Sequence, residues 1–240
     1  MKTIWILTKK ELRNYFDSLI AYVMIVLFLG FSGLFTWLYG SDVFLTGQAS
    51  LRTFFGIAYW TLFFFIPALT MKSIAEEKKS GTLELLLTKP ISDWQLIWGK
   101  FFAAFGIILI TLLLTISYVI TLANIGNLDD GAVILGYFGL LLMSATYIGI
   151  GIFASSISNN QIVAFLIALF IGLFFHIIFG VFASSSVGFL SNLFNYLDLS
   201  THFESIARGV LDTKDLIYFL SIMFIGLYLS VISLSKRNLD

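Results

Sequence analysis

The chain has 240 residues, of which 59% are hydrophobic and only 12% are charged, and its mean hydropathy is +0.96. Soluble domains contain about 45–50% apolar and about 25% charged residues, so this composition predicts a polytopic membrane protein without a separate soluble domain. The formal net charge is zero, and the absence of cysteine excludes a disulfide framework, thiolate catalysis and cysteine metal sites. We expect residues 1–240 to form a single transmembrane domain.

The first segment, Ile4 to Asp17, has the pattern of an amphipathic helix. Most of its apolar side chains share one arc with a threonine, namely Ile4, Trp5, Thr8, Leu12, Tyr15 and Phe16. Basic and polar side chains occupy the other arc (Lys9, Lys10, Arg13, Asn14 and Asp17), with Ile6, Leu7 and Glu11 as exceptions. Aromatic residues opposite basic ones suit a helix that lies in the interface plane of a membrane, and a frayed extension is the alternative.

Six apolar runs follow, and each is close to the roughly 20 residues that are needed to cross the hydrocarbon core. We expect the spans at residues 19–38, 54–71, 101–123, 132–153, 162–182 and 216–234. Six spans place both termini on one side of the membrane. The N-terminal segment, the loop 72–100 and the tail hold four, five and two of the 14 Lys and Arg residues, so the positive-inside rule predicts that this side is cytoplasmic.

The loop from Lys72 to Lys100, between the second and third spans, is the only long polar interruption on the predicted cytoplasmic side. Gly81 interrupts its charged run, and Thr82 to Thr88 has the pattern of a short amphipathic helix. Pro90 ends that helix, because the residue before a proline is pushed out of the helical region. The arrangement suggests a docking site for another protein, and a solvated connection between spans is the alternative.

Three short polar patterns predict helix starts or turns. Ser92 with Gln95 three positions later is a capping-box pattern for the third span. Asp212 with Asp215 suits the start of the last helix. The adjacent carboxylates at 129–130 have no partner ligands in the sequence and indicate a solvated turn rather than a metal or acid–base site.

No catalytic constellation is recognisable. The G-x-G-x-x-A run at 149–154 lies inside an apolar span and indicates helix packing, and there is no Walker A motif. His176 is the clearly ionisable side chain deep in a span, which makes it a functional candidate or a hydrogen-bonded packing residue. It belongs to a row of mostly small residues, spaced by four, that we expect to form a close helix contact across a dimer or, alternatively, within one subunit. The row consists of Ala164, Ala168, Gly172, His176 and Gly180.

The docking loop resembles that of type-2 ABC exporter permeases. The shared pattern, E-x-x-x-x-G-T-x-E-x-L-L-x-x-P, is formed here by Glu76, Gly81, Thr82, Glu84, Leu86, Leu87 and Pro90. In that family the short helix is a coupling helix that sits in a groove of the ATPase subunit, and the N-terminal helix is an elbow helix. The resemblance therefore implies that these residues couple the chain to an ATPase.

A second resemblance covers the stretch THFESIARGVLDTKDLIYFLS, from Thr201 to Ser221. It is similar to the segment before the last span in permeases for nitrous-oxide-reductase maturation and Bacteroidetes gliding motility, and is closest to the gliding-motility subunit. The run SSISNNQIVAF after the fourth span also matches. The resemblance implies short helices in the outer leaflet that gate the exit, with Phe203, Glu204 and Arg208 as gate residues. Glu204 and Arg208 are spaced for an i,i+4 ion pair.

Taken over the whole chain, the resemblance implies an all-α permease subunit of an ATP-driven exporter in a bacterial inner membrane. Its expected partners are an ABC ATPase, a second identical or different permease, an accessory membrane subunit and membrane lipids, with no nucleic acid. The permease would perform no bond chemistry and hold no cofactor, since ATP and Mg²⁺ belong to the ATPase. A non-transporting anchor or scaffold of a motility or secretion complex is the alternative. An ion-coupled transporter is disfavoured, because the predicted spans nearly lack carboxylates.

Overall fold

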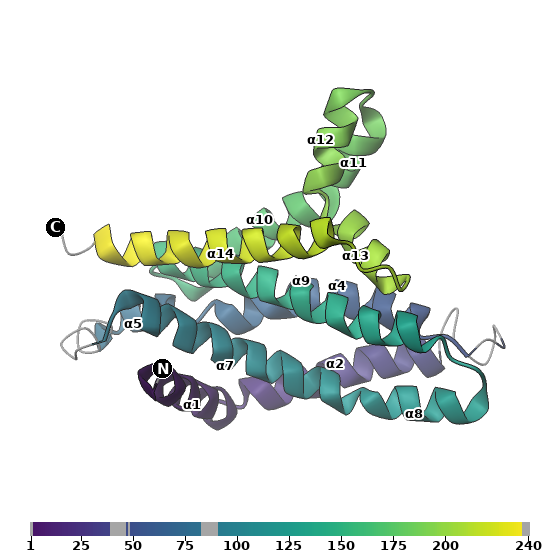
Figure 1. The fold of residues 1–240 in the computed structure, drawn as a ribbon. Helices are drawn as coiled ribbons and strands as arrows, with labels where there is room; N and C mark the ends of the chain where they lie inside the picture. Colours follow the sequence, from purple (N-terminus) through teal and green to yellow (C-terminus); the bar gives the residue numbers. More distant parts are fainter. Residues whose placement is uncertain (1, 39–46, 48, 83–90, 237–240) are drawn as a thin grey trace.

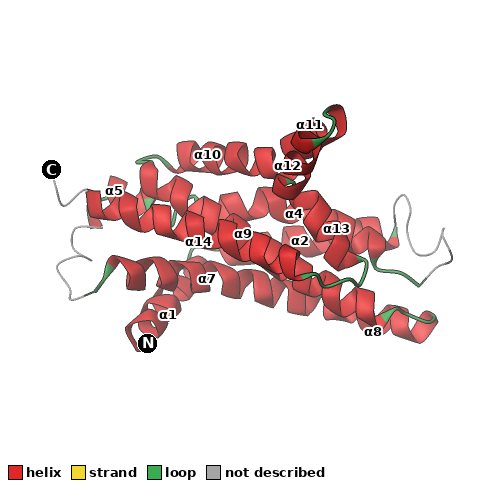
Figure 2. Cartoon of the chain, turned by 45° about the horizontal axis from the view of Figure 1, so that its top comes forward, coloured by secondary structure: helices red, strands yellow, loops and turns green. Residues whose placement is uncertain are grey.

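The computed structural model describes residues 2–38, 47, 49–82 and 91–236, and in this part of the chain it contains helices and no strand (Figure 2). Six helical segments of the described residues are long and apolar enough to cross a membrane. They are Ile20–Trp37, Arg52–Lys79, Asp93–Ile125, Asp130–Ile157, Gln161–Ser185 and Thr213–Ser235. The predicted all-α fold with six spans is confirmed.

Several spans are built from more than one helical piece. The N-terminal helix α1 (Lys2–Asp17) leads into α2 (Ile20–Trp37), and the second span comprises α4 (Arg52–Thr70) and α5 (Ala75–Lys79). The third joins α7 (Asp93–Leu114) to α8 (Ile116–Ile125), and the fourth is the single helix α9 (Asp130–Ile157). The fifth consists of α10 (Gln161–Leu173), a π-helical turn η1 (Phe174–Ile178) and α11 (Phe179–Ser185). Two short helices, α12 (Phe189–Leu197) and α13 (Leu199–Ala207), precede the last span α14 (Thr213–Lys236).

Helix α9 is the centre of the bundle and packs against α4, α7, α10, α13 and α14. Its most extensive contact is with α14, where a Cβ atom added at Gly149 would lie 2.8 Å from the Met223 carbonyl oxygen. Gly226 faces the same seam, and Gly151 gives the Thr70 side chain of α4 even closer access. Small residues let helix backbones approach within lipid, where hydrophobic burial no longer drives association. The glycine run at 149–154 is therefore a packing element, as predicted.

Both termini lie at one end of the bundle, which we call the termini side (Figure 1). The end of α14 reaches the end of α9 there, since the Ser233 hydroxyl donates to the Ser156 carbonyl at 3.0 Å. Helix α5 and the start of α7 lie on the same side, and the turn between α8 and α9 lies on the opposite side. On that opposite side α11 and α12 form a hairpin that projects away from the other helices (Figures 1 and 2).

Local capping follows the sequence closely. At α7 the Ser92 side chain accepts from the Gln95 main-chain N–H and the Gln95 side chain accepts from the Ser92 N–H, both at 3.3 Å, so the predicted capping box is confirmed. Asp129 caps α9 by accepting from the Ala132 N–H at 3.2 Å. Asp212 accepts from the Lys214 N–H at the start of α14.

The buried face of α1 differs from the predicted apolar arc. It consists of Leu7, Thr8, Glu11 and Tyr15, whereas Trp5 is 62% exposed. The helix packs on α7, where Gly99 leaves room for Leu7. A Cβ atom at Gly99 would lie 2.7 Å from the Leu7 Cβ, so this contact determines which side of α1 is buried.

Candidate functional site

The turn between α4 and α5, at the base of the predicted docking loop, is held by one hydroxyl from the end of α9. The main-chain N–H groups of Ile74 and Ala75 both donate to Ser155 Oγ at 3.0 Å, and this hydroxyl donates to the Met71 carbonyl at 3.0 Å. Ser155 and both amides are buried. These bonds satisfy main-chain groups that the helix break would otherwise leave unpaired. The start of α5 is thereby fixed to the central helix.

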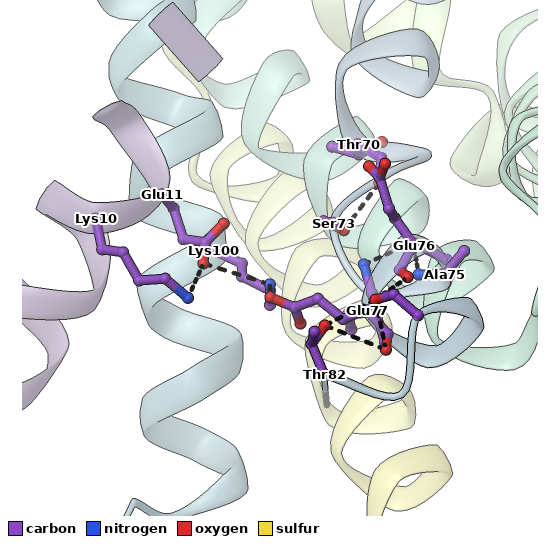
Figure 3. A network of polar contacts seen from close by, with 12 residues as sticks. Lys10, Glu11, Thr70, Ser73, Ala75, Glu76, Glu77, Thr82 and Lys100 are labelled. Carbon is purple, nitrogen blue, oxygen red and sulfur yellow. Dashed lines mark hydrogen bonds and ion pairs between the residues drawn. The ribbon is translucent and has the colours of Figure 1, made fainter. Parts of the chain in front are cut away.

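Lys100 joins three helices at the same level. Its Nζ lies 2.8 Å from Glu77 Oε1 of α5 and 3.6 Å from Glu11 Oε1 of α1, and Lys100 itself belongs to α7 (Figure 3). Glu77 precedes the predicted coupling segment in the chain and Lys100 follows it. The ion pair therefore links the two ends of the loop to each other and to the N-terminal helix.

This charged group is largely shielded from water. Lys100 is 2% exposed and Glu11 is 8% exposed, while Lys10, which reaches Glu11 at 3.5 Å, remains on the surface. A buried ammonium group is tolerated only when nearby charges and hydrogen bonds replace its hydration. The two carboxylates supply the compensating charge, which explains why Glu11 lies on the buried face of α1, while Lys100 Nζ has no further hydrogen-bond partner among the described residues.

Tyr15 adds a neutral contact beside the charged group. Its hydroxyl donates to the Leu69 carbonyl near the end of α4 at 3.3 Å. Burial, with the Glu11 and Glu77 carboxylates as further causes, raises the pKa of this hydroxyl well above its usual value. Tyr15 therefore stays a hydrogen-bond donor, and α1 is attached to α4 as well as to α7.

A cavity of about 560 Å³ opens between α1 and the α4–α5 turn. Its walls carry both charges and several hydroxyl groups. They include Lys10, Asn14, Tyr15, Lys72, Glu76 and Thr82. The described residues around it contain no group of three or more His, Asp or Glu side chains that could hold a metal ion.

The structure describes the first three of the predicted coupling residues. Glu76 lies in the first turn of α5, and Gly81 follows the helix with φ of +69°, a conformation that favours glycine, so the predicted turn is present. Thr82 Oγ1 lies 2.8 Å from the Ser80 hydroxyl. Glu84, Leu86, Leu87 and Pro90 lie outside the described residues, and their role stays a prediction.

The small-residue row of the fifth span is buried inside the subunit. Ala164, Ala168 and Gly172 face α9 and α4, and a Cβ atom at Gly172 would lie 3.0 Å from Phe63 and 3.3 Å from Tyr147. Gly180 lies farther along, next to Asp198. Three members of the row thus pack against spans of the same chain, whereas Gly180 is half-buried. The contact of the row across a dimer stays a prediction.

His176 lies in the π-helical turn at the centre of an aromatic cluster. Its Nδ1 is 2.7 Å from the Tyr147 hydroxyl, and its ring lies between those of Tyr59 and Phe63, with centroid distances of 4.1 and 4.4 Å. The Ser200 hydroxyl at the start of α13 donates to the His176 carbonyl at 3.0 Å and accepts from Tyr59 at 2.9 Å. His176 thus connects the fifth span to α4, α9 and α13 by packing and hydrogen bonds, while its Nε2 has no hydrogen-bond partner among the described residues, and its functional role stays a prediction.

The predicted gate residues have different environments. Phe203 is buried and stacks on Tyr59 at 4.9 Å, so it packs inside the subunit. Glu204 and Arg208 are exposed, and Arg208 Nε donates to the main-chain carbonyl of Glu204 at 3.0 Å. The expected ion pair between these side chains is not present: the guanidinium donates instead to the Glu204 carbonyl, which also accepts from the Arg208 main-chain N–H at 3.2 Å.

Two contacts were missed by the sequence interpretation. The burial of Lys100 between Glu11 and Glu77 was not predicted, although Glu11 is an exception to the separation of apolar and polar arcs in α1. A pair between His202 and Asp215, at 2.6 Å, was also missed, because Asp215 had been assigned to helix capping. A carboxylate on an otherwise apolar face was the available signal in the first case.

Comparisons with known proteins agree with this architecture. Residues 5–235 match the family described as ABC-2 family transporter protein. The chain belongs to this family. It is also 28% identical, over 151 residues, to the probable multidrug ABC transporter permease YbhR of Escherichia coli K12 and to the protein of the same name from strain O157:H7. The match includes 60% of this chain and only 39% of either relative, so the chain spans about two fifths of their length.

Family membership and the six apolar helices identify an integral membrane protein of the transmembrane-permease type. Permeases of this family in general dimerise and work with an ABC ATPase. The connected polar residues on the termini side are accordingly the candidate coupling site.

Proposed function

We propose that the chain is the permease subunit of an ATP-driven exporter, with both termini and the loop 72–100 in the cytoplasm of a bacterial cell. The excess of Lys and Arg on the termini side supports this orientation, since positive residues favour the cytoplasmic face of the inner membrane. ATP and Mg²⁺ would be bound by a separate ATPase subunit. The chain itself would supply the path and the moving helices.

The observation that carries the proposal is the attachment of both ends of the docking loop to the bundle. Force applied between Glu77 and Lys100 would reach α1 through Glu11 and α7 through Lys100. It would also reach α9 through Ser155, which holds the start of α5. Closure of two ATPase subunits would in this way move the spans of two permeases and alternate access to a path between them.

A role in gliding motility or secretion belongs to the same proposal and rests on the resemblance of residues 201–221. The second candidate is a non-transporting anchor of a motility or secretion complex. The similarity to a probable multidrug permease favours transport. An anchor requires a stable polar surface for its partner, but it does not require that surface to be joined to several spans.

The test is to alter the predicted coupling residues in a reconstituted complex of the permease with its partner ATPase. Leu86→Asp, or reversal of charge by Glu84→Lys, should abolish the influence of the permease on ATP hydrolysis while membrane insertion stays intact. Arg52→Glu, which reverses an exposed charge at the start of α4 on the opposite side, is the matched control and should behave as the wild type. Unchanged ATPase binding and unchanged ATPase regulation in both loop variants would contradict the proposal.

A further inference from the structure

A buried pair of titratable side chains lies on the side opposite the termini, away from the coupling site. His202 of α13 and Asp215 in the first turn of α14 are 4% and 0% exposed. Nδ1 of His202 lies 2.6 Å from Asp215 Oδ1, and Nε2 lies 3.2 Å from the Tyr196 carbonyl at the end of α12. One imidazole ring therefore connects three helices.

The two contacts determine how many protons the pair holds. A carbonyl oxygen can only accept a hydrogen bond, and a neutral imidazole carries one N–H group. A neutral imidazole beside an ionised carboxylate can therefore make only one of these two hydrogen bonds. Both form only when the pair holds one further proton. With that proton the pair is an imidazolium beside a carboxylate and has no net charge, which reduces the cost of burying it.

The same pair holds the hairpin of α11 and α12. No residue of α12 is buried, and the hairpin projects from the bundle (Figure 1). At its end the Tyr196 carbonyl meets His202, and the next carbonyl, that of Leu197, accepts from the Tyr218 hydroxyl at 2.6 Å. The Tyr218 ring also lies on the imidazole, with 4.0 Å between centroids. The last turn of α12 is thus fastened to α13 and α14 at this point.

We propose that His202 and Asp215 form a proton-operated latch. With the additional proton bound, the pair fastens the end of α12, and without that proton it releases the end of α12. When the proton leaves, the remaining ring N–H is the one at Nδ1, which donates to Asp215, because a carboxylate is a stronger acceptor than a carbonyl. Nε2 then turns a lone pair towards the Tyr196 carbonyl, and the contact becomes repulsive. Low pH on the side opposite the termini fastens the hairpin, and high pH there frees it. The latch goes beyond the proposed transport function and does not depend on it.

A cavity gives the latch access to water, and the neighbouring charged and titratable side chains have partners of their own or line that cavity. With Arg208 and Lys214 the pair lines a cavity of about 350 Å³, and Lys214 is itself paired with Asp212 at 3.1 Å. Asp198, at the junction of α12 and α13, accepts from Thr201 and caps α13. On α9, which packs against α13 and α14, the Tyr147 hydroxyl contacts His176 and not the latch.

The test uses spin labels on cysteines introduced into this cysteine-free chain at Leu193 of α12 and Ile134 of α9, both exposed. The distance distribution is measured in liposomes from about pH 5 to about pH 9, which includes the range in which histidines usually change charge. We expect a narrow distribution at low pH that becomes broader and longer at high pH. The same distribution at every pH in the otherwise wild-type chain would overturn the proposal.

The two histidines of the chain provide a matched pair of variants. His202→Gln should give the broad distribution at every pH, because one amide cannot donate strongly to both acceptors and carries no charge. His176→Gln should keep the pH dependence. A pH response that persists in His202→Gln, or that is lost only in His176→Gln, would contradict the latch, and the pH series on the histidine-intact chain remains decisive if a variant fails to fold.

Discussion

At each end of the bundle one buried side chain connects three helices, but the chemistry of the connection differs. On the termini side Lys100 connects α1, α5 and α7 through two carboxylates, and on the opposite side His202 connects α12, α13 and α14 through one carboxylate and one carbonyl. The ammonium group is held by two opposite charges, whereas the imidazole is held by hydrogen bonds to two acceptors that, in the proposed latch, depend on one proton. The first connection is therefore permanent and suits the transmission of force. The second is conditional.

Removal of the permanent cation should have the largest effect. Lys100→Met leaves the buried Glu11 and the half-buried Glu77 without their shared partner, and breaking a buried pair costs about 3–5 kcal/mol of stability. Equilibrium unfolding in lipid–detergent micelles measures the loss. Lys10→Met, at a surface position, should change stability by less than about 1 kcal/mol.

The stability lost in Lys100→Met can be restored by further substitutions if the loss comes from the unpaired carboxylates. Glu11→Met and Glu77→Met, combined with Lys100→Met, replace the whole charged group by hydrophobic side chains of similar volume, which is often neutral or stabilising. The triple variant should recover most of the stability that Lys100→Met loses. A triple variant that is less stable than Lys100→Met would mean that the group is held by packing and not by charge.

Loss of the hydroxyl at the base of the loop should have an intermediate effect. Ser155→Ala leaves two buried main-chain N–H groups without an acceptor, at a cost of about 1–3 kcal/mol. Hydrogen exchange at Ile74 and Ala75 should accelerate, because these amides donate to Ser155. Ser235→Ala, which removes an exposed hydroxyl that bonds only within its own helix, is the control and should leave exchange at both amides unchanged.

The smallest effect is expected in the aromatic cluster around His176, within the spans. Tyr147→Phe removes one hydrogen bond to His176 but keeps the rings of Tyr59 and Phe63 around the imidazole, so we expect a loss of about 0.5–1.5 kcal/mol. Tyr228→Phe, at an exposed position, should leave stability unchanged. A loss as large as that of Lys100→Met would remove the distinction between the charged group on the termini side and this aromatic cluster.

The spans and the capping box could be predicted because their signals are local. A run of apolar residues needs only its own length to cross a bilayer, and Ser92 needs only Gln95. The packing role of the glycines at 149–154 was also predictable, since no strand or phosphate-binding turn could form inside an apolar span.

The buried face of α1 could not be read from its own pattern. It depends on Gly99 and Lys100, which are about ninety residues away in the chain and become neighbours only in the fold. The His202–Asp215 pair has the same origin, because the turn between α13 and α14 brings together residues that look like a helix surface and a helix cap. Arg208 illustrates the reverse case, in which a main-chain carbonyl of α13 accepts from the guanidinium in place of the expected carboxylate.

The central claim is that motion of the docking loop reaches the spans through Glu77 and Lys100. Its most direct measurement is the change, on addition of ATP and Mg²⁺ to the reconstituted complex, in the distance between spin labels at Ile6 of α1 and Leu113 of α7, both exposed. The account predicts a distance change in the otherwise wild-type chain that is lost in Glu77→Gln and kept in Lys214→Met, with the ATPase still bound in each case. An equal distance change in Glu77→Gln would contradict it.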